Sequence, residues 1–360
     1  SRRTKLEEAA ATGTRLDRLA LESSADLTLQ LAGAQLGITI ASLALGFLGA
    51  GAAQPGIADG EPWLQRIQQA AASTSYQGTL AYAAGGSVSS TRVLHYCDGR
   101  QTYERLELLD GESRLQYRHN DQVLTLWPAS KRAMLEHRDP VAQFPALPVA
   151  SSARVLENYD LHKLGQERVA GQDADVLLLK PRDRLRFAQR LWAHRETGLL
   201  LRNDVLGPAG EVLESAAFVD LRIGGKPHPE PILKAMKQLD GFQVSRPAAE
   251  RTQLDAEGWA IAKPVPGFQL VSCTRRPLDA SASDKVAPLQ VIQSVFSDGL
   301  AQVSVFIERY DPHRHPKAMA TSMGSSNTVM VRRGEWWLTV VGEVPMATAQ
   351  QFESLLERRR

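Results

Sequence analysis

The stretch from Glu167 to Leu221 decides the fold, and it reads ERVAGQDADVLLLKPRDRLRFAQRLWAHRETGLLLRNDVLGPAGEVLESAAFVDL. Its apolar runs are separated by turn signals at residues 180–183, 195–198 and 207–210. Short connections let each strand pair with its neighbour along the chain, so the pattern predicts a meander of antiparallel strands. One face of such a sheet can be apolar while the other meets water. The stretch carries no nucleophile, metal cluster or phosphate loop, and we interpret it as a surface that binds another molecule.

Further strands are predicted upstream of the meander. From Tyr76 onward apolar residues recur at every second position, and Asp98-Gly99 and Asp110-Gly111 are hairpin signals. Together with the meander they predict about nine strands in one antiparallel sheet, more than usually stay flat. Residues 128–164 are expected to form a loop and a short helix across the open face. The prediction is a half-closed antiparallel β-barrel around an apolar cavity, and an ordinary packed sheet without a cavity is the alternative.

The chain from residue 258 onward predicts a second, smaller unit. Strands are expected at 289–296, 301–308, 328–332 and 336–344, followed by a closing helix at 347–358. Strands followed by one helix in about 100 residues indicate a small α+β domain. The predicted fold class is therefore mainly β. The predicted division is an N-terminal segment at 1–53, a linker at 54–61, the half-barrel domain at 62–222, a linker at 223–257 and the α+β domain at 258–360.

The N-terminal segment is apolar from Leu27 to Ala53. About 20 apolar residues suffice to cross a bilayer as a helix. Basic residues precede the segment and acidic residues follow it, which predicts a cytoplasmic N-terminus and an exported remainder. Ala50-Gly51-Ala52 also fits a signal-peptide cleavage site, and a buried helix of a soluble protein is a further alternative. Two parts, RRTKLEEAAATG and LAGAQLGITIASLALGFLGA, resemble the transmembrane domain of CorC/CNNM-type magnesium and cobalt efflux proteins.

Composition argues against several classes of function. Lys and Arg number 42 against 40 Asp and Glu, so no basic field indicates nucleic-acid binding. Only Cys97 and Cys273 are present, which excludes a disulfide framework and a multi-cysteine zinc site; small buried thiols are expected, with a bridge between them as the alternative. Residues 311–316, DPHRHP, are a weak metal candidate. No nucleophile elbow, P-loop or dinucleotide fingerprint occurs, so we expect no enzyme, cofactor or metal.

Seven stretches along the chain resemble the MucB/RseB family of periplasmic regulators of the envelope stress sigma factor. They are SYQGTLAY (75–82), ERLELLDG (104–111), ERVAGQDADVLLLKPRDRLRF (167–187), HRETGLLLRNDVLGPAGEVLE (194–214), VPGFQL (265–270), FSDGLAQVSVFIE (296–308) and WLTVVGEVP (337–345). The resemblance spans residues from about 63 to 345 in order. Residues 1–53 depart from the family pattern, which begins with an ordinary signal peptide.

This resemblance implies a fold and a role. The large domain should be similar to the lipoprotein carriers LolA and LppX. The protein should reside in the periplasm, where residues 27–53 could anchor it to the inner membrane, and should bind the periplasmic region of an anti-sigma factor of RseA/MucA type. It should shield that region from proteolysis and release it in response to lipopolysaccharide or mislocalised lipid. A periplasmic lipid or lipoprotein carrier is the alternative function, and a homo-oligomer is compatible with either.

Two sets of residues are predicted to bind the lipid. The apolar members of alternating strands are expected to line the cavity for acyl chains: Tyr82, Leu106, Leu108, Leu124, Leu126 and Leu178. The choice of face depends on the strand register, because a shift by one residue inverts it. Four arginines of one segment are expected to contact phosphates of the headgroup: Arg182, Arg184, Arg186 and Arg190.

Overall fold

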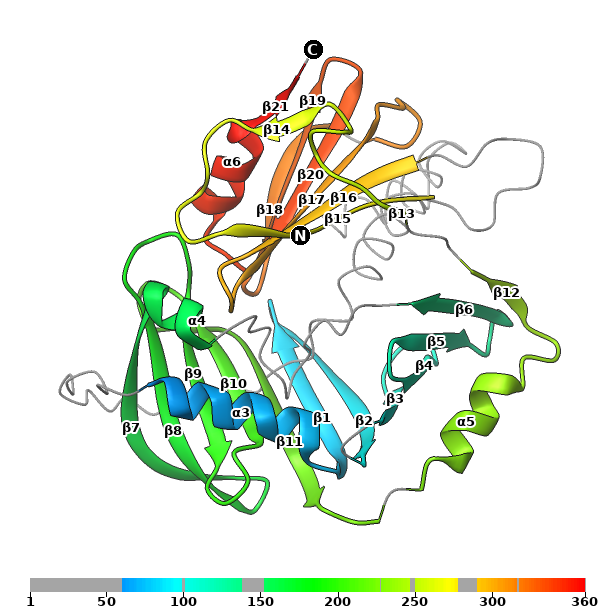
Figure 1. Ribbon diagram of the computed structural model, residues 1–360, viewed down its shortest axis with the longest axis vertical. Coiled ribbons are helices and arrows are strands. Elements are labelled where there is room, and N and C mark those ends of the chain that lie inside the picture. The colour runs from blue at the N-terminus through cyan, green and yellow to red at the C-terminus, as the bar shows by residue number, and fades with distance from the viewer. Residues whose placement is uncertain are drawn as a thin grey trace, which may run out of the picture.

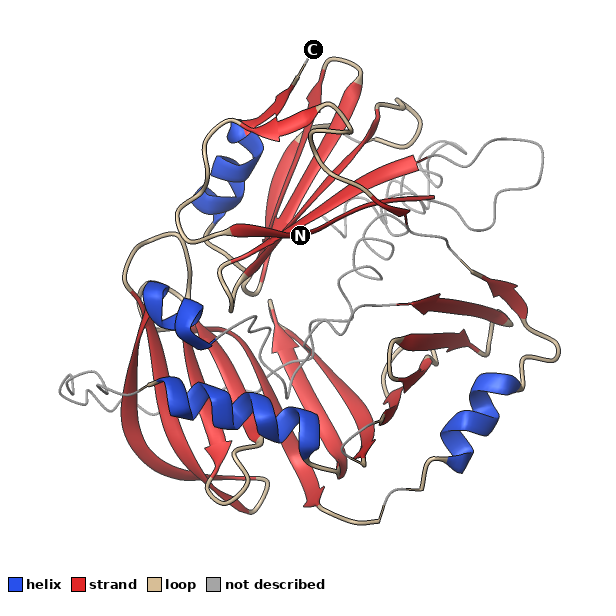
Figure 2. Ribbon diagram, viewed as in Figure 1, coloured by secondary structure: helices blue, strands red, loops and turns tan. Residues whose placement is uncertain are grey.

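A large β-sheet, a smaller C-terminal β-sheet, a two-stranded ladder and four helices make up the described part of the chain. The computed structural model describes residues 60–98, 101–137, 152–226, 228–246, 250–277, 290–315 and 317–359. Figure 1 shows the large sheet in the lower half of the view and the smaller C-terminal sheet above it. Figure 2 shows that strands dominate both parts, with helices lying against them. The prediction of a mainly β chain with a small C-terminal α+β part is confirmed.

The large sheet has 12 strands in the order β12-β6-β5-β4-β3-β2-β1-β11-β10-β9-β8-β7. Neighbours pair antiparallel, except that β12 pairs with β6 in parallel. The strands are β1 (Tyr76–Ala84), β2 (Ser87–Cys97), β3 (Thr102–Leu108), β4 (Leu115–His119), β5 (Gln122–Trp127), β6 (Arg132–His137), β7 (Tyr159–Val169), β8 (Gln172–Pro181), β9 (Ala188–His194), β10 (Leu200–Leu206), β11 (Val212–Ile223) and β12 (Gln243–Ser245).

The meander is confirmed, whereas the closure of the sheet is not. Strands β8 to β11 are each paired with their neighbour in the chain, as the turn signals predict. Among the described strands β7 and β12 form the two edges and do not pair with each other, so the sheet is open and not a barrel. Residues 159–164, expected to cross the open face, instead begin edge strand β7. The residues after Leu161 are mostly polar, so the sequence pattern does not indicate a strand there. The strand is stabilised by its backbone hydrogen bonds to β8.

The helical spacing of Trp63, Leu64 and Ile67 predicts a short amphipathic helix at 63–72, and helix α3 (Glu61–Ser73) confirms it. Pro62 stands in its first turn, where a missing N–H costs nothing. Leu64 and Ile67 are fully buried against Leu177, Leu179 and Leu191 of the large sheet. The short helix α4 (Ser152–Asn158) lies next to α3 in Figure 1 and adds Val155 to the same cluster.

The segment expected as a linker at 223–257 contains two elements of the large sheet. Helix α5 (Glu230–Lys237) is followed by β12. Met236, Leu239 and Phe242 pack against Leu124 and Leu126 of β5. The predicted domain boundaries stay a prediction, but α5 and β12 belong to the packing of the large sheet.

The C-terminal sheet has seven strands in the order β13-β15-β16-β17-β20-β19-β18. They are β13 (Glu250–Arg251), β15 (Gln269–Pro277), β16 (Gln290–Ser297), β17 (Gln302–Arg309), β18 (Met319–Met323), β19 (Ser326–Arg333) and β20 (Trp336–Gly342). Helix α6 (Met346–Leu355) covers the sheet, and Phe352 contacts the rings of Phe268 and Phe296. A ladder of β14 (Trp259–Ile261) and β21 (Leu356–Arg358) closes the unit.

Two further expectations concern the cysteines and the membrane segment. Cys97 of β2 and Cys273 of β15 are both buried free thiols, as expected for small apolar side chains. In the described ranges no helix combines the length and the apolar character that crossing a membrane requires. The apolar segment at 27–53 lies outside those ranges.

Candidate functional site

The six predicted cavity residues do not share one face of the large sheet. Cross-strand partners project to the same face, so the register assigns each residue. Leu106 pairs with Gln116, which pairs with Thr125, so the neighbouring Leu124 and Leu126 project to the opposite face. The sequence does not show to which face each leucine projects. Alternation is visible within each strand, but the relative register of two strands is not.

The face of Leu106 also carries Leu108 and Tyr82. Leu106 is partly buried against a cluster that includes Leu80 and Val93. Ala70 of α3 belongs to the same cluster, so the helix covers part of this face. Tyr82 forms a hydrogen bond with Glu214. The predicted acyl-chain surface is therefore narrowed to Tyr82, Leu106 and Leu108.

The other three predicted cavity residues are placed differently. Leu124 is fully buried and Leu126 is buried beneath the residues that follow α5. Leu178 pairs with Arg190 of β9, which pairs with Asp204 of β10. Asp204 pairs with Ser215 of β11, and Ser215 pairs with Ala83 of β1. Leu178 therefore shares a face with Ala83, which is the face opposite to that of its neighbour Tyr82. These three leucines cannot line a cavity together with Leu106 and Leu108.

The four predicted headgroup arginines are separated as well. Arg184 is exposed, and Arg182 is exposed and pairs with Asp160 at 3.0 Å. Arg190 is partly buried, with its guanidinium 5.8 Å from the ring centre of Trp192. Arg186 is only 3% exposed and is surrounded by protein groups. A guanidinium with its donors already bonded inside the fold does not reach a lipid phosphate, so we remove Arg186 from this set.

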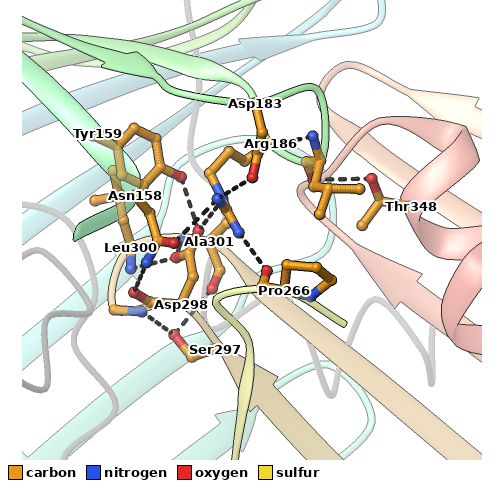
Figure 3. A network of polar contacts seen from close by, with 12 residues as sticks. Asn158, Tyr159, Asp183, Arg186, Pro266, Ser297, Asp298, Leu300, Ala301 and Thr348 are labelled. Carbon is orange, nitrogen blue, oxygen red and sulfur yellow. Dashed lines mark hydrogen bonds and ion pairs between the residues drawn. The ribbon is translucent and has the colours of Figure 1, made fainter. Parts of the chain in front are cut away.

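Arg186 instead joins the two sheets, as Figure 3 shows. Its Nε lies 2.7 Å from Oδ2 of Asp298 and its Nη1 lies 2.7 Å from Oδ2 of Asp183. Nη2 donates to the carbonyl oxygen of Pro266 at 2.8 Å, and Nη1 donates to Oδ1 of Asn158 at 3.2 Å. We call Asn158, Tyr159, Asp183, Arg186, Pro266 and Asp298 the arginine junction. It fixes the segment before β9 to the C-terminal part.

Asp298 is the counterpart of Arg186 and is fully buried. The Asp298-Gly299 turn between β16 and β17 places its Oδ1 to accept from the amides of Leu300 and Ala301 at 2.8 and 2.7 Å. Tyr159 donates its hydroxyl to Oδ2 at 3.1 Å. Burial raises the pKa of Asp298, while these amides and the charge of Arg186 oppose the rise. The sequence predicts the two strands that this turn connects, but not the contact between Asp298 and Arg186.

A second bond reinforces this junction on the side of α6. Thr348 is fully buried and donates its hydroxyl to the carbonyl oxygen of Leu185 at 2.9 Å. Leu185 itself packs against the core of the C-terminal part. The segment from Asp183 to Arg186 is therefore held by side chains from several elements of the C-terminal part.

The large sheet also has a cavity of about 380 Å³ over β1, β2, β3 and β11. Arg92 and Arg105 line it, and each lies 3.0 Å from the same oxygen of Glu107. Arg222 and Asp220 of β11 complete its charged rim. Sequence reasoning missed this site, because these residues are the polar members of three alternating strands and only the register brings them together.

A hollow of about 540 Å³ lies between α6 and strands β18 and β19 of the C-terminal sheet. Met319 and Met323 of edge strand β18 are 45% and 57% exposed. The motif at 311–316 does not form a metal site within the described ranges: His315 is buried, with Nε2 3.3 Å from Glu308, and its Nδ1 accepts from the amide of Asp311. The cavity over β1, β2, β3 and β11 and the hollow beside α6 are therefore candidate binding surfaces.

Known proteins resemble this chain over most of its length. The sigma factor AlgU regulatory protein MucB of Pseudomonas aeruginosa is 32% identical over 301 residues, which cover 82% of this chain and 89% of that protein. The sigma-E factor regulatory protein RseB of Haemophilus influenzae is 25% identical and covers 80% of this chain and 88% of its own length. These relatives carry the names of regulatory proteins, not of enzymes.

Solved structures agree with the sequence comparison. A crystal structure of MucB in complex with MucA(peri) superimposes with a TM-score of 0.63 and 26% identity, over 84% of this chain and all of that one. MucB alone gives a TM-score of 0.61 over 85% of this chain. The resemblance of residues 1–53 to CorC/CNNM-type proteins is not confirmed, since the family matches begin at residue 59. The MucB/RseB N-terminal domain matches residues 59–238 and the MucB/RseB C-terminal domain matches residues 253–357, so this chain belongs to the MucB/RseB family.

Proposed function

We propose that this protein is a periplasmic negative regulator of an envelope stress response. It binds the periplasmic segment of a membrane-spanning anti-sigma factor of MucA/RseA type and shields that segment from the protease that would destroy it. The observation that carries the proposal is the shared two-part fold with a MucB that was solved bound to MucA(peri). Binding, not catalysis, is its activity.

One feature of the structure supports a binding role. The arginine junction holds the large sheet and the C-terminal part together through a buried ion pair and several hydrogen bonds. A partner can therefore contact both parts of one pre-formed surface, which lowers the entropy that binding costs. We also propose that residues 27–53 direct export of the remainder and anchor it to the inner membrane where they are retained.

We further propose that lipopolysaccharide or mislocalised lipid releases the partner. Acyl chains would contact the face of Tyr82, Leu106 and Leu108, and headgroup phosphates would contact Arg182, Arg184 and Arg190. A triple Arg→Ala variant at these positions should bind lipopolysaccharide at least about tenfold more weakly, because each charge-assisted bond to phosphate contributes. The Arg168→Ala variant, exposed at the opposite end of β7, is the matched control. Unchanged affinity in the triple variant would remove the arginines from the proposal.

Calorimetric titration of the chain with the periplasmic segment of its anti-sigma factor tests the function directly. We expect submicromolar binding to the free protein and weaker binding after loading with lipopolysaccharide. A scrambled segment of the same composition is the control. Lipid uptake without any binding of the segment would overturn the regulator and favour the lipid or lipoprotein carrier.

A further inference from the structure

The two sheets meet at a second place, where the tip of the β18–β19 hairpin lies against the large sheet. Gly324 at this tip has φ +60°, and a Cβ on it would be 2.7 Å from Cβ of Ala84 at the end of β1. The carbonyl oxygen of Leu213 would be 3.1 Å away. On the other side of the contact, a Cβ on Gly85 would be 3.2 Å from Cγ of Met323. The two backbones therefore approach so closely that glycine is required at the tip.

A carboxyl group of each part lies at this contact. Ser325, fully buried, donates its hydroxyl to Oε2 of Glu214 at 2.5 Å. Glu214 of β11 is buried and also forms a hydrogen bond with Tyr82 of β1. Glu343 follows β20, is half-buried, and interacts with the charge of Glu214. We call Tyr82, Glu214, Ser325 and Glu343 the glutamate junction.

The charges at this junction are of one sign. Neither Glu214 nor Glu343 forms an ion pair with a cation of the described residues. The neighbouring elements contribute neutral groups: β1 places Ala84 and β10 places Val205 opposite Glu214, and the carbonyl oxygen of Gln302 on β17 accepts from the amide of Glu343. Two carboxyl groups whose charges interact at a buried and half-buried position cannot both ionise without cost.

The two carboxyls differ in their hydrogen bonds. Burial raises the pKa of Glu214 to about 7, although the bonds from Ser325 and Tyr82 stabilise its charged form. Burial, and then the charge of Glu214, raise the pKa of Glu343 to about 8. Glu343 accepts no comparable bond within the described ranges. The pair therefore holds a proton near neutral pH, and Glu343 is the group that carries it when Glu214 is charged.

We propose that the glutamate junction is a pH-sensitive latch between the two parts, closed while Glu214 and Glu343 hold a proton and opened when both are charged. The arginine junction stays in place over the same pH range, because its buried groups carry opposite charges. Opening of the latch would therefore separate the β18–β19 tip from β1 and β11, while the arginine junction stays intact. This regulation goes beyond the proposed function and does not depend on which partner binds.

Hydrogen exchange of backbone amides in the full chain tests the latch. Protection of residues 322–327 should fall at least about tenfold between about pH 6 and about pH 9, after correction for the intrinsic exchange rate. Protection of residues 298–301 in the arginine junction should stay constant. Equal loss of protection in both segments would indicate general loosening of the protein and would overturn the latch.

A neutral variant identifies the responsible group. In Glu343→Gln, protection of the tip should depend on pH much less than in the wild type, because the pair can acquire only the charge of Glu214. Glu335→Gln is the matched control: Glu335 is 81% exposed on the same part of the chain and pairs with Arg309, so the pH dependence should persist. A wild-type tip that is equally protected at both pH values refutes the proposal even where the variant does not fold.

Discussion

The arginine junction and the glutamate junction join the same two parts of the chain by opposite electrostatic means. At the first, a guanidinium meets a carboxylate, and both are buried and hydrogen-bonded. At the second, two carboxyls meet and a proton has to balance them. One contact between the parts should therefore be insensitive to pH near neutrality, whereas the other should depend on it.

Removing the cation from the arginine junction should have the largest effect. Arg186→Met leaves the carboxylate of Asp298 buried without its partner, which costs about 3–5 kcal/mol of unfolding free energy. Arg184→Met in the same segment changes an exposed side chain and should stay within about 0.5 kcal/mol of wild type. Urea denaturation of the two variants measures both values. Equal stability of the two would mean that the ion pair does not hold the parts together.

Changing pH should produce the next largest effect, and only at the glutamate junction. Both carboxyls have a pKa in the folded protein above the ordinary value of about 4.3, so their contribution to stability is complete below about pH 4. It is lost as pH rises through about 7 and about 8. Relative to Glu343→Gln, the wild type should lose about 2–3 kcal/mol of unfolding free energy between about pH 5 and about pH 9. Unfolding free energies that change in parallel with pH in the two proteins would contradict the predicted loss of stability in the wild type.

A steric change at the glutamate junction should have a smaller effect. Gly324 and Gly334 both have φ +60°, so alanine adds the same backbone strain at either position. Only at Gly324 would the new methyl group meet the large sheet, whereas nothing lies within 4 Å at Gly334. Gly324→Ala should therefore cost about 1–2 kcal/mol more than Gly334→Ala. Thermal unfolding of both variants measures this difference. Equal decreases in melting temperature would indicate that the tip does not contact Ala84.

The smallest expected effect is the loss of one hydroxyl beside the arginine junction. Thr348→Val keeps the shape of the side chain but removes the hydrogen bond to the carbonyl oxygen of Leu185. This bond is buried, so its loss should cost about 1 kcal/mol, measurable by chemical denaturation. Thr328→Val on strand β19, where the side chain is partly exposed, is the control and should change stability less. An unchanged Thr348→Val variant would indicate that Arg186 alone carries this contact.

Local signals predicted much of the fold. Strands β8 to β11 and helix α3 were recognised because their apolar residues recur with a clear period and turn residues bound them. Strand β18 was missed, because all five of its residues are exposed and none of the pattern of a half-buried strand remains. Helix α5 falls inside the predicted linker, because the strand it packs against lies more than 100 residues earlier and the local pattern does not indicate that contact.

The amino-acid sequence alone predicts the mainly β character, the meander, the smaller C-terminal α+β part and membership of the MucB/RseB family. Those properties depend on periodicity, turn chemistry and ordered motifs, which are all readable along the chain. The three-dimensional structure was needed to show which leucines share a face, that Arg186 is buried, and that Ser325 donates a hydrogen bond to Glu214. Register and contacts between distant segments set these outcomes, because burial and charge pairing depend on what lies opposite in space.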